Sequence, residues 1–201
     1  MSLAPTPPRH EANPFITVIN HINICVYFPY KQMNRDFVVD VIVEIERHSN
    51  EKWEYDRKND SLFLDRVLPE PYFYPQAYGF FPDTLGKDGD ELDILLITDK
   101  TYKNYNSDKQ TTRGYIVGGI MMHDEKGEDA KIFVVPENEI VSYLNKSEVE
   151  KTEIYDEIIR FFSNYKSKDS DKWSRVDSVL SYLDAVELYK QSKKDFLGKQ
   201  I

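Results

Sequence analysis

The sequence contains a single cysteine, Cys25, among its 201 residues. One cysteine cannot form an internal disulfide, which excludes a disulfide-stapled scaffold and suits a reducing compartment. No apolar run approaches the roughly 20 residues that a membrane-spanning helix needs. The N-terminus shows no basic region followed by an apolar stretch, so we expect no secretory signal. These absences predict a cytoplasmic protein that does not enter a membrane.

The chain also lacks an excess of basic residues. Its 26 Lys and Arg residues against 35 Asp and Glu residues give a formal net charge of -9 at pH 7. Bulk charge of this sign repels nucleic acid, so we expect no nucleic-acid partner. Hydrophobic residues make up 40% of the chain, which is enough to build a core. The length favours one domain, which we place at 15–201 after a flexible, proline-rich arm at 1–14.

Strand-like patterns fill the first two thirds of the chain, and helix-like patterns follow. Alternating or short apolar runs predict strands at 36–46, 51–57, 59–68, 92–98, 114–121 and 130–135, the second and third forming a hairpin. Apolar spacings of three and four predict helices at 137–145, 148–165 and 177–197. Segment 15–30 is β-rich without a clear register, and 69–90 reads as loop.

The order of these segments indicates the fold class. Strands that come before the helices are typical of α+β proteins, and parallel βαβ units would need a helix between successive strands. We therefore predict a small closed antiparallel β-barrel of five strands, OB-like, with flanking C-terminal helices.

Carboxylates cluster at the start of one predicted strand. Asp88 and Asp90 flank Gly89, and Asp93 begins the apolar run that follows. A bend at Gly89 would let the three carboxylates converge, and carboxylates this close repel one another unless a cation lies among them. The spacing does not fit an EF-hand loop.

A second acidic cluster surrounds a Lys-Gly turn. Asp124 lies before this turn, and Asp129 lies after it, two residues from Lys131 on the same face of the next strand. A carboxylate beside a lysine suits a site that holds a hard divalent cation and an anionic oxygen. Taken alone, either cluster is more often a solvated turn than a site.

Six motifs in the same order resemble the soluble inorganic pyrophosphatases of family I. They are VEI at 43–45, LFLDR at 62–66, FYPQAYGF at 73–80, DGDELDI at 88–94, DEKGEDAK at 124–131, and FFSNYK at 161–166 followed by DKW at 171–173. The resemblance covers roughly residues 38 to 190 and implies hydrolysis of inorganic pyrophosphate to two orthophosphates. It implies Mg²⁺ as the cofactor, several ions per site, with Mn²⁺ or another divalent ion as alternatives.

The resemblance also implies a role for each matching residue. Asp90 resembles the general base for a hydroxide that the metals hold and that attacks phosphorus in line, with Tyr78 as a nearby hydroxyl donor. The implied metal ligands are Glu44, Asp88, Asp93, Asp124 and Asp129. The implied substrate-binding residues are Lys52, Arg66, Lys131, Tyr165 and Lys166. Glu54 would belong to an outer acidic shell, and Lys172 to the supporting charges.

Two positions depart from the pattern of the family. Glu91 stands where proline is usual, so the loop loses a fixed φ and gains a charge. Ala77 stands where asparagine is usual, which removes a polar side chain near Tyr78.

Two other functions and one question of assembly stay open. The same fold could serve as a non-catalytic acidic interaction module, or the site could hydrolyse another phosphoanhydride such as polyphosphate or a nucleotide. The substrate is expected as its magnesium complex, because a carboxylate-lined cavity would repel free pyrophosphate. The chain is short and has no long insert, so it resembles the compact hexameric members of the family more than the longer dimeric ones. The resemblance therefore implies a homo-oligomer, a hexamer ahead of a dimer.

Overall fold

The computed structural model describes residues 17–19, 22–24, 37–102 and 110–199. The arm expected at 1–14 lies outside the described residues, as do Cys25 and most of the β-rich segment 15–30. Of that segment only the two short strands β1 (Thr17–Ile19) and β2 (Ile22–Ile24) are described, and they pair antiparallel.

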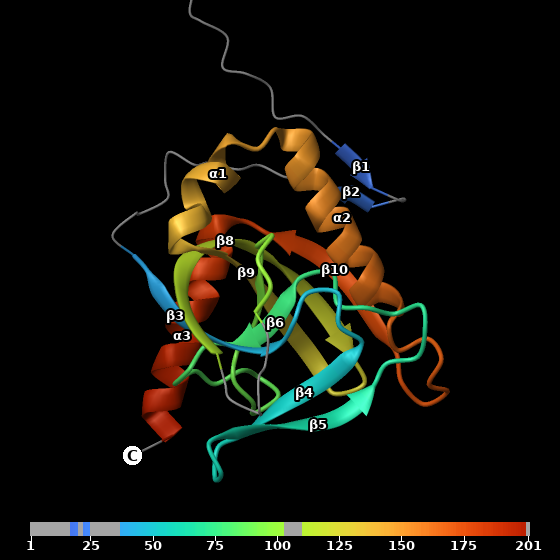
Figure 1. Cartoon of the computed structure of the whole chain (residues 1–201), viewed down its shortest axis with the longest axis vertical. Coiled ribbons are helices and arrows are strands. Elements are labelled where there is room, and N and C mark those ends of the chain that lie inside the picture. The colour runs from blue at the N-terminus through green and yellow to red at the C-terminus, as the bar shows by residue number, and fades with distance from the viewer. Residues whose placement is uncertain (1–16, 20–21, 25–36, 103–109, 200–201) are drawn as a thin grey trace, which may run out of the picture.

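Five strands close into a ring (Figure 1). They are β3 (Val39–Ile45), β6 (Ala77–Phe80), β7 (Asp93–Leu96), β8 (Gln110–Asp124) and β9 (Gly127–Pro136). The ring runs β8–β3–β6–β7–β9, and β9 pairs back with β8. A ring of this kind pairs every strand on both sides, which leaves its members no open edge. The predicted α+β fold with a small five-stranded barrel is confirmed.

One pairing in the ring differs from the antiparallel prediction. β7 and β9 run parallel, with Asp93 opposite Lys131 and Leu96 opposite Val134. The reason is the order of the chain: β8 lies between β7 and β9 in sequence and turns directly into β9, so that β9 returns in the direction of β7.

A separate hairpin and three helices complete the fold. Strands β4 (Glu51–Asp56) and β5 (Ser61–Val67) form a two-stranded sheet below the ring in Figure 1. A 3₁₀ turn at Glu137–Glu139 leads into α1 (Ile140–Asn145) and α2 (Glu148–Asn164), and α3 (Tyr182–Lys199) follows later. The hairpin predicted at 51–68 and the helices predicted at 137–145 and 148–165 are therefore present.

Two predicted elements were wrong. The segment 177–197 is not one helix, because β10 (Ser174–Leu180) pairs with β8 before α3 begins at Tyr182. The segment 69–90 is not entirely loop, because it contains β6, which lies between β3 and β7.

Apolar side chains of the barrel sort into two buried clusters. One contains Leu95, Phe133 and Val135 together with α2 residues such as Tyr155 and Ile158. The other contains the alternate positions of the same strands, including Ile94, Leu96 and Ile132, together with Ala185 and Val186 of α3. This alternation follows from the two-residue period of a strand. Helix α2 therefore packs with the side chains on one face of the barrel strands, and α3 packs with those on the other face.

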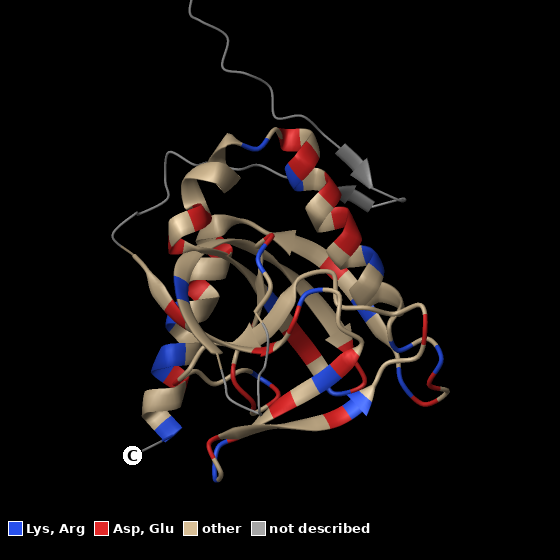
Figure 2. Ribbon diagram, in the orientation of Figure 1, with Lys and Arg blue, Asp and Glu red and all other residues tan. Residues whose placement is uncertain are grey.

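Charged residues concentrate away from these clusters. Figure 2 shows both signs of charge along the β4–β5 hairpin and on the loops near it, while most of the ring is uncharged. Within the described residues, no helix is both long and apolar enough to cross a membrane.

Candidate active site

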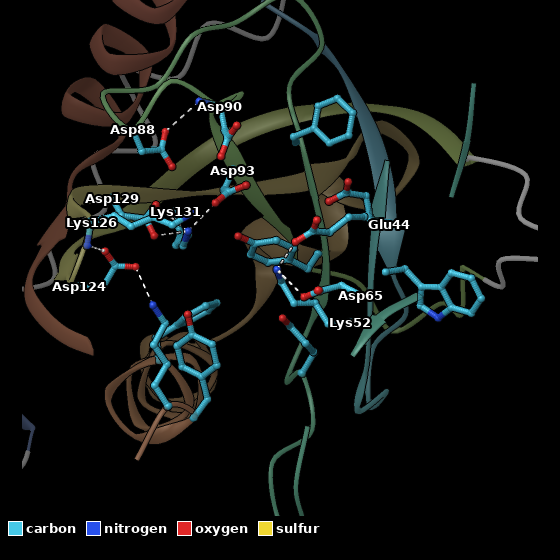
Figure 3. A pocket seen from close by; sticks show the side chains of 18 of the residues that line it. Glu44, Lys52, Asp65, Asp88, Asp90, Asp93, Asp124, Lys126, Asp129 and Lys131 are labelled. Atoms are coloured by element: carbon cyan, nitrogen blue, oxygen red, sulfur yellow. Dashed lines mark hydrogen bonds and ion pairs between the residues drawn. The ribbon is translucent and has the colours of Figure 1, made fainter. Parts of the chain in front are cut away.

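All fourteen residues that the sequence singled out line one cavity of about 450 Å³. They come from β3, the β4–β5 hairpin, β6, the loop before β7, β7, β8, β9 and the segment that follows α2. Figure 3 shows Asp124, Asp129 and Lys131 on one side of the cavity and Glu44, Lys52 and Asp65 on the other, with Asp93 between them. The fold thus gathers side chains that lie up to 128 positions apart in the sequence, from Glu44 to Lys172.

A buried lysine lies between two carboxylates at the bottom of the cavity. Lys131 is 3% exposed, and its Nζ lies 2.5 Å from Asp93 Oδ2 and 2.6 Å from Asp129 Oδ1. The parallel register of β7 and β9 places Asp93 directly opposite Lys131. Burial disfavours the ammonium, but Asp93 and Asp129 outweigh it and hold the pKa of Lys131 above its usual value. Lys131 is therefore a permanent positive charge at this depth.

A second lysine joins the end of α2 to the β8–β9 turn. Lys166 Nζ donates to Asp124 Oδ2 at 2.8 Å and to Glu125 Oε1 at 2.9 Å. Burial would raise the pKa of the Asp124 carboxyl, but the bond from Lys166 and the backbone N–H of Lys126 lower it. Asp124 is consequently ionised at neutral pH.

The hairpin supplies the opposite wall. Lys52 Nζ bonds to Glu54 on the same strand and lies 3.3 Å from Asp65 Oδ2 on the partner strand. Arg66 lies opposite Lys52 in the β4–β5 register, and its guanidinium lies 3.7 Å from Asp65. Two cations with carboxylate partners therefore face the acidic bottom of the cavity.

Glu44 is a buried carboxylate beside the cavity. Its Oε1 accepts the backbone N–H of Tyr55 at 2.9 Å, which ties the hairpin to β3. Burial, and secondarily the charge of Asp93, raise the pKa of Glu44 to about 8. A carboxyl group in this state binds a proton at neutral pH unless a cation takes the place of that proton.

The Asp88–Asp90 loop lies at the rim. Gly89 has a φ of +95°, the left-handed conformation that glycine adopts without strain, and this bend turns the loop toward the cavity. The Asp90 N–H donates to Asp88 Oδ1 at 3.2 Å. Among the described residues, no lysine or arginine forms an ion pair with Asp90, in contrast to Asp93, Asp124 and Asp129.

Two tyrosines lie close to Lys131. The ring of Tyr78 lies 5.6 Å from Lys131 Nζ, and burial together with Asp93 raises the pKa of its hydroxyl well above the ordinary value. Burial also raises the pKa of Tyr165, whose ring stacks on Phe161. Both hydroxyl groups therefore stay protonated and can donate hydrogen bonds.

The departure at Ala77 is explained by the strand. Ala77 is fully buried in the apolar cluster that α3 covers, while Tyr78, the next residue of β6, faces the cavity. A side chain at 77 therefore points away from the hydroxyl of Tyr78.

The donor chemistry of the cavity fits hard divalent cations. Its lining includes ten carboxylates and six Lys or Arg side chains, so full ionisation leaves an excess of four negative charges. Among the described residues, no three His, Cys, Asp or Glu side chains converge as a ready-made metal cage. The lysine contacts give the physical reason, because Asp93, Asp124 and Asp129 turn toward Lys131 and Lys166. The oxygen donors, the charge excess and the high pKa of Glu44 nevertheless suit a hard divalent cation.

Sequence reasoning left some lining residues unassigned. Asp65 and Glu125 pair with Lys52 and Lys166, and Glu91 lies on the rim. Asp65 is next to Arg66 in the sequence, and Glu125 is next to Asp124. Position beside a predicted site residue was therefore the signal that could have identified them. Trp173, which would ordinarily be a packing residue, is 49% exposed.

Comparison with known proteins gives a consistent result. A family model described as inorganic pyrophosphatase matches residues 41–197. The inorganic pyrophosphatase of Saccharolobus solfataricus is 37% identical over 158 residues, which is 77% of this chain and 89% of that protein. The inorganic pyrophosphatase of Pseudomonas aeruginosa is 38% identical over 150 residues, which is 71% of this chain and 83% of that protein.

Solved structures share the fold. The inorganic pyrophosphatase of Helicobacter pylori matches with a TM-score of 0.73 at 31% identity, covering 83% of this chain and 98% of that one. The structure from Thermus thermophilus matches with a TM-score of 0.72 at 32% identity, covering 80% of this chain and 91% of that one. The overall fold of this chain is thus common to these proteins.

Proposed function

Because this chain belongs to the inorganic pyrophosphatase family, we propose that it hydrolyses inorganic pyrophosphate to two orthophosphates in a Mg²⁺-dependent reaction. The observation that carries the proposal is the joint lining of one cavity by all fourteen expected residues. Acidic and basic side chains line that cavity together, as a site needs when it holds divalent cations and a small polyanion.

The carboxylates are the proposed ligands of the cations. Glu44, Asp88, Asp93, Asp124 and Asp129 would hold several Mg²⁺ ions, with Mn²⁺ or another divalent ion as substitutes. Such ions, when bound, neutralise the substrate and lower the pKa of a coordinated water toward about 7. Glu54 and Lys172 complete the surrounding charges.

The cationic and phenolic groups are the proposed contacts of the two phosphates. Lys131 and Lys166 keep their protons, so each can donate to phosphate oxygens and stabilise the negative charge that develops on the leaving group. Lys52, Arg66 and Tyr165 line the same cavity and would hold the remaining oxygens. Tyr78 donates its hydroxyl beside Asp93. The pyrophosphate would thus be held in line with the attacking water.

Asp90 is the proposed general base. Its carboxylate lies at the rim, lacks an ion-pair partner within the described residues, and is aimed by the Gly89 bend. It would accept the proton of the attacking water, while the leaving phosphate departs without a covalent intermediate on the protein.

Phosphate release from pyrophosphate tests the proposal. We expect hydrolysis with millimolar Mg²⁺, loss of the activity with chelator, and a decrease in kcat of about 10²–10⁴-fold in Asp90→Asn. The matched control is Asp40→Asn, because Asp40 is exposed on β3 outside the cavity. A purified, folded protein that released no phosphate with Mg²⁺ would overturn the proposal. Tripolyphosphate and ATP in the same assay distinguish the other phosphoanhydrides.

We also propose that the protein acts in the cytoplasm as a homo-oligomer, a hexamer ahead of a dimer, with residues 15–201 as one domain. The lone cysteine supports a reducing compartment. The number of subunits is read directly from sedimentation equilibrium.

A further inference from the structure

The tip of the β4–β5 hairpin touches the loop that carries Asp88 and Asp90. Arg57, in the turn after β4, forms an ion pair with Glu91, the residue that follows Asp90. The side chain of Glu91 is 17% exposed and that of Arg57 is 56% exposed. Glu91 lines the cavity, and Arg57 approaches it from outside. The pair therefore links two walls of the site across its rim.

The hairpin turn is braced so that it presents Arg57 in a fixed position. Asp56 accepts the Lys58 N–H at 2.8 Å and the Asn59 amide at 2.5 Å. The Tyr55 hydroxyl donates to Asp60 at 2.5 Å, and Asp60 adopts a φ of +51°. Turns closed by local side-chain bonds of this kind have little freedom to swing. The backbone that carries Arg57 is thus held by the turn, and its guanidinium is held by the ion pair with Glu91.

The hairpin also contacts the barrel through β4. Tyr55 bonds to Glu44 through its N–H, and its ring lies 5.7 Å from the ring of Phe80. The Arg57–Glu91 pair adds a second point of attachment near the tip. The pair therefore adds to the contacts that hold the tip of the hairpin in place and links it to the Asp88–Asp90 loop.

Resting on the proposed function, we infer that Arg57 and Glu91 are positioning residues that hold the phosphate-binding hairpin against the Asp88–Asp90 loop. The hairpin carries Lys52 and Arg66, which would bind phosphate, and the loop carries Asp90, the proposed base. The ion pair fixes the separation between them. The ion pair also restrains the loop at position 91, where Glu91 replaces the proline whose ring would otherwise fix φ.

Arg57 has a second effect, on charge. The cavity already has more carboxylates than cations, and Glu91 is one of those carboxylates. Without Arg57, its charge would be uncompensated at the entrance and would repel an anionic substrate. Loss of Arg57 should therefore be more harmful than loss of the charge on Glu91.

This asymmetry defines the experiment. Steady-state hydrolysis of pyrophosphate with saturating Mg²⁺ is compared in Arg57→Gln, Glu91→Gln and the double variant. We expect Arg57→Gln to raise KM roughly three- to tenfold with kcat within about twofold, because the hairpin cations bind substrate and transition state alike. Glu91→Gln should have a smaller effect. The double variant should match Glu91→Gln, because Arg57 then has no charge left to neutralise.

Two further variants separate this role from a general loss of stability. Arg57→Lys keeps the positive charge, so its KM should lie close to that of the parent protein. Arg113→Gln is the matched control, because Arg113 pairs with Asp40 and Glu137 away from the cavity, and its KM should equal that of the parent protein. An unchanged KM in Arg57→Gln overturns the inference, as does an Arg57→Gln effect that is equally large with and without Glu91→Gln.

Hydrogen exchange gives a readout that does not depend on activity. In Arg57→Gln, amides of residues 57–60 and 86–92 should exchange faster together, while those of Arg113→Gln should not change there. Unchanged exchange in both segments contradicts the inference. If the parent protein released no phosphate from pyrophosphate, the proposed function would fail while this measurement still tested the contact.

Discussion

At the scale of single residues, the site depends on which partner each carboxylate has. Asp93 and Asp129 share Lys131, and Asp124 shares Lys166 with Glu125. A cation that binds these carboxylates would take over the neutralisation that the lysines provide, leaving the ammonium groups to phosphate oxygens. The same side chains can therefore serve the resting protein and the loaded site, because a buried charge needs a partner in either state.

Glu44 gives a prediction about pH. Its pKa in the fold is raised from 4.5 to about 8, so its contribution to stability is fully present below pH 4.5 and is lost as the pH rises toward 8. We expect Glu44→Gln to be more stable than the parent protein at pH 8 in chelator, by on the order of a few kcal/mol. The glutamine oxygen can still accept the Tyr55 N–H. Urea unfolding at several pH values measures the difference.

The difference in unfolding free energy between Glu44→Gln and the parent protein should disappear near pH 4. A stability difference that stayed constant from pH 4 to pH 8 would contradict the prediction. Glu139→Gln is a useful comparison, because Glu139 is a carboxylate outside the cavity that pairs with Lys100 at 3.1 Å.

At the scale of elements, long stretches with a clear apolar period gave correct helices and strands, whereas short or mixed stretches did not. β6 spans only Ala77–Phe80, which is too short for alternation to stand out among the prolines and aromatic residues around it. Within the predicted helix 177–197, Val179 and Leu180 lie four and three residues before Leu183, a helical spacing, although the helix begins only at Tyr182. Ser181 was the signal for that boundary, since its hydroxyl accepts the Asp184 N–H at 3.2 Å.

The site was predictable from ordered motifs, whereas its internal contacts were not. Asp129 and Lys131 share a face because they are two apart on one strand, which sequence alone indicates. The contact between Asp93 and Lys131 requires the parallel register of β7 and β9, which the antiparallel prediction excluded. Likewise, the Arg57–Glu91 pair depends on how far the hairpin leans over the ring, and no spacing within the sequence encodes that.

A glycine in β6 provides the test at this scale. A Cβ at Gly79 would lie 1.9 Å from the backbone oxygen of Ile42, so an alanine would force β6 away from β3. We expect Gly79→Ala to lose roughly 3 kcal/mol or more of unfolding free energy, or to fail to accumulate as folded protein. Denaturant unfolding and the soluble yield measure the effect.

The matched control is Gly198→Ala at the end of α3. A Cβ there meets no atom within 4 Å among the described residues, and alanine favours a helix over glycine. Its stability should equal or slightly exceed that of the parent protein. Equal behaviour of the two variants would show that the close approach of β3 and β6 is not required.

At the scale of the whole molecule, the negative charge of the chain is concentrated where it can attract cations. The cavity has an excess of four carboxylates within a chain of net charge -9. Repulsion among them opposes folding until cations bind, so the folded protein and the divalent ion should stabilise each other.

Thermal unfolding tests this linkage. Mg²⁺ at about a hundred times its dissociation constant adds about 2.7 kcal/mol of stability, which corresponds to a rise in Tm of roughly 5–10 °C for a chain of this size. Asp93→Asn should lose most of this rise, and Asp40→Asn should keep it. Sodium chloride at equal ionic strength corrects for screening. An equal rise in Asp93→Asn would show that the ions bind elsewhere.

The place of β9 in the sequence determines when the ring can close during synthesis of the chain. Strand β7, which carries Asp93, pairs with β6 on one side and with β9 on the other. In the sequence, β9 comes only after β8. Strand β9 carries Lys131, so the pairing that completes the barrel also brings the positive charge that neutralises Asp93. A nascent chain that stops short of β9 would hold an unclosed sheet with an unneutralised carboxylate, which makes premature assembly unfavourable.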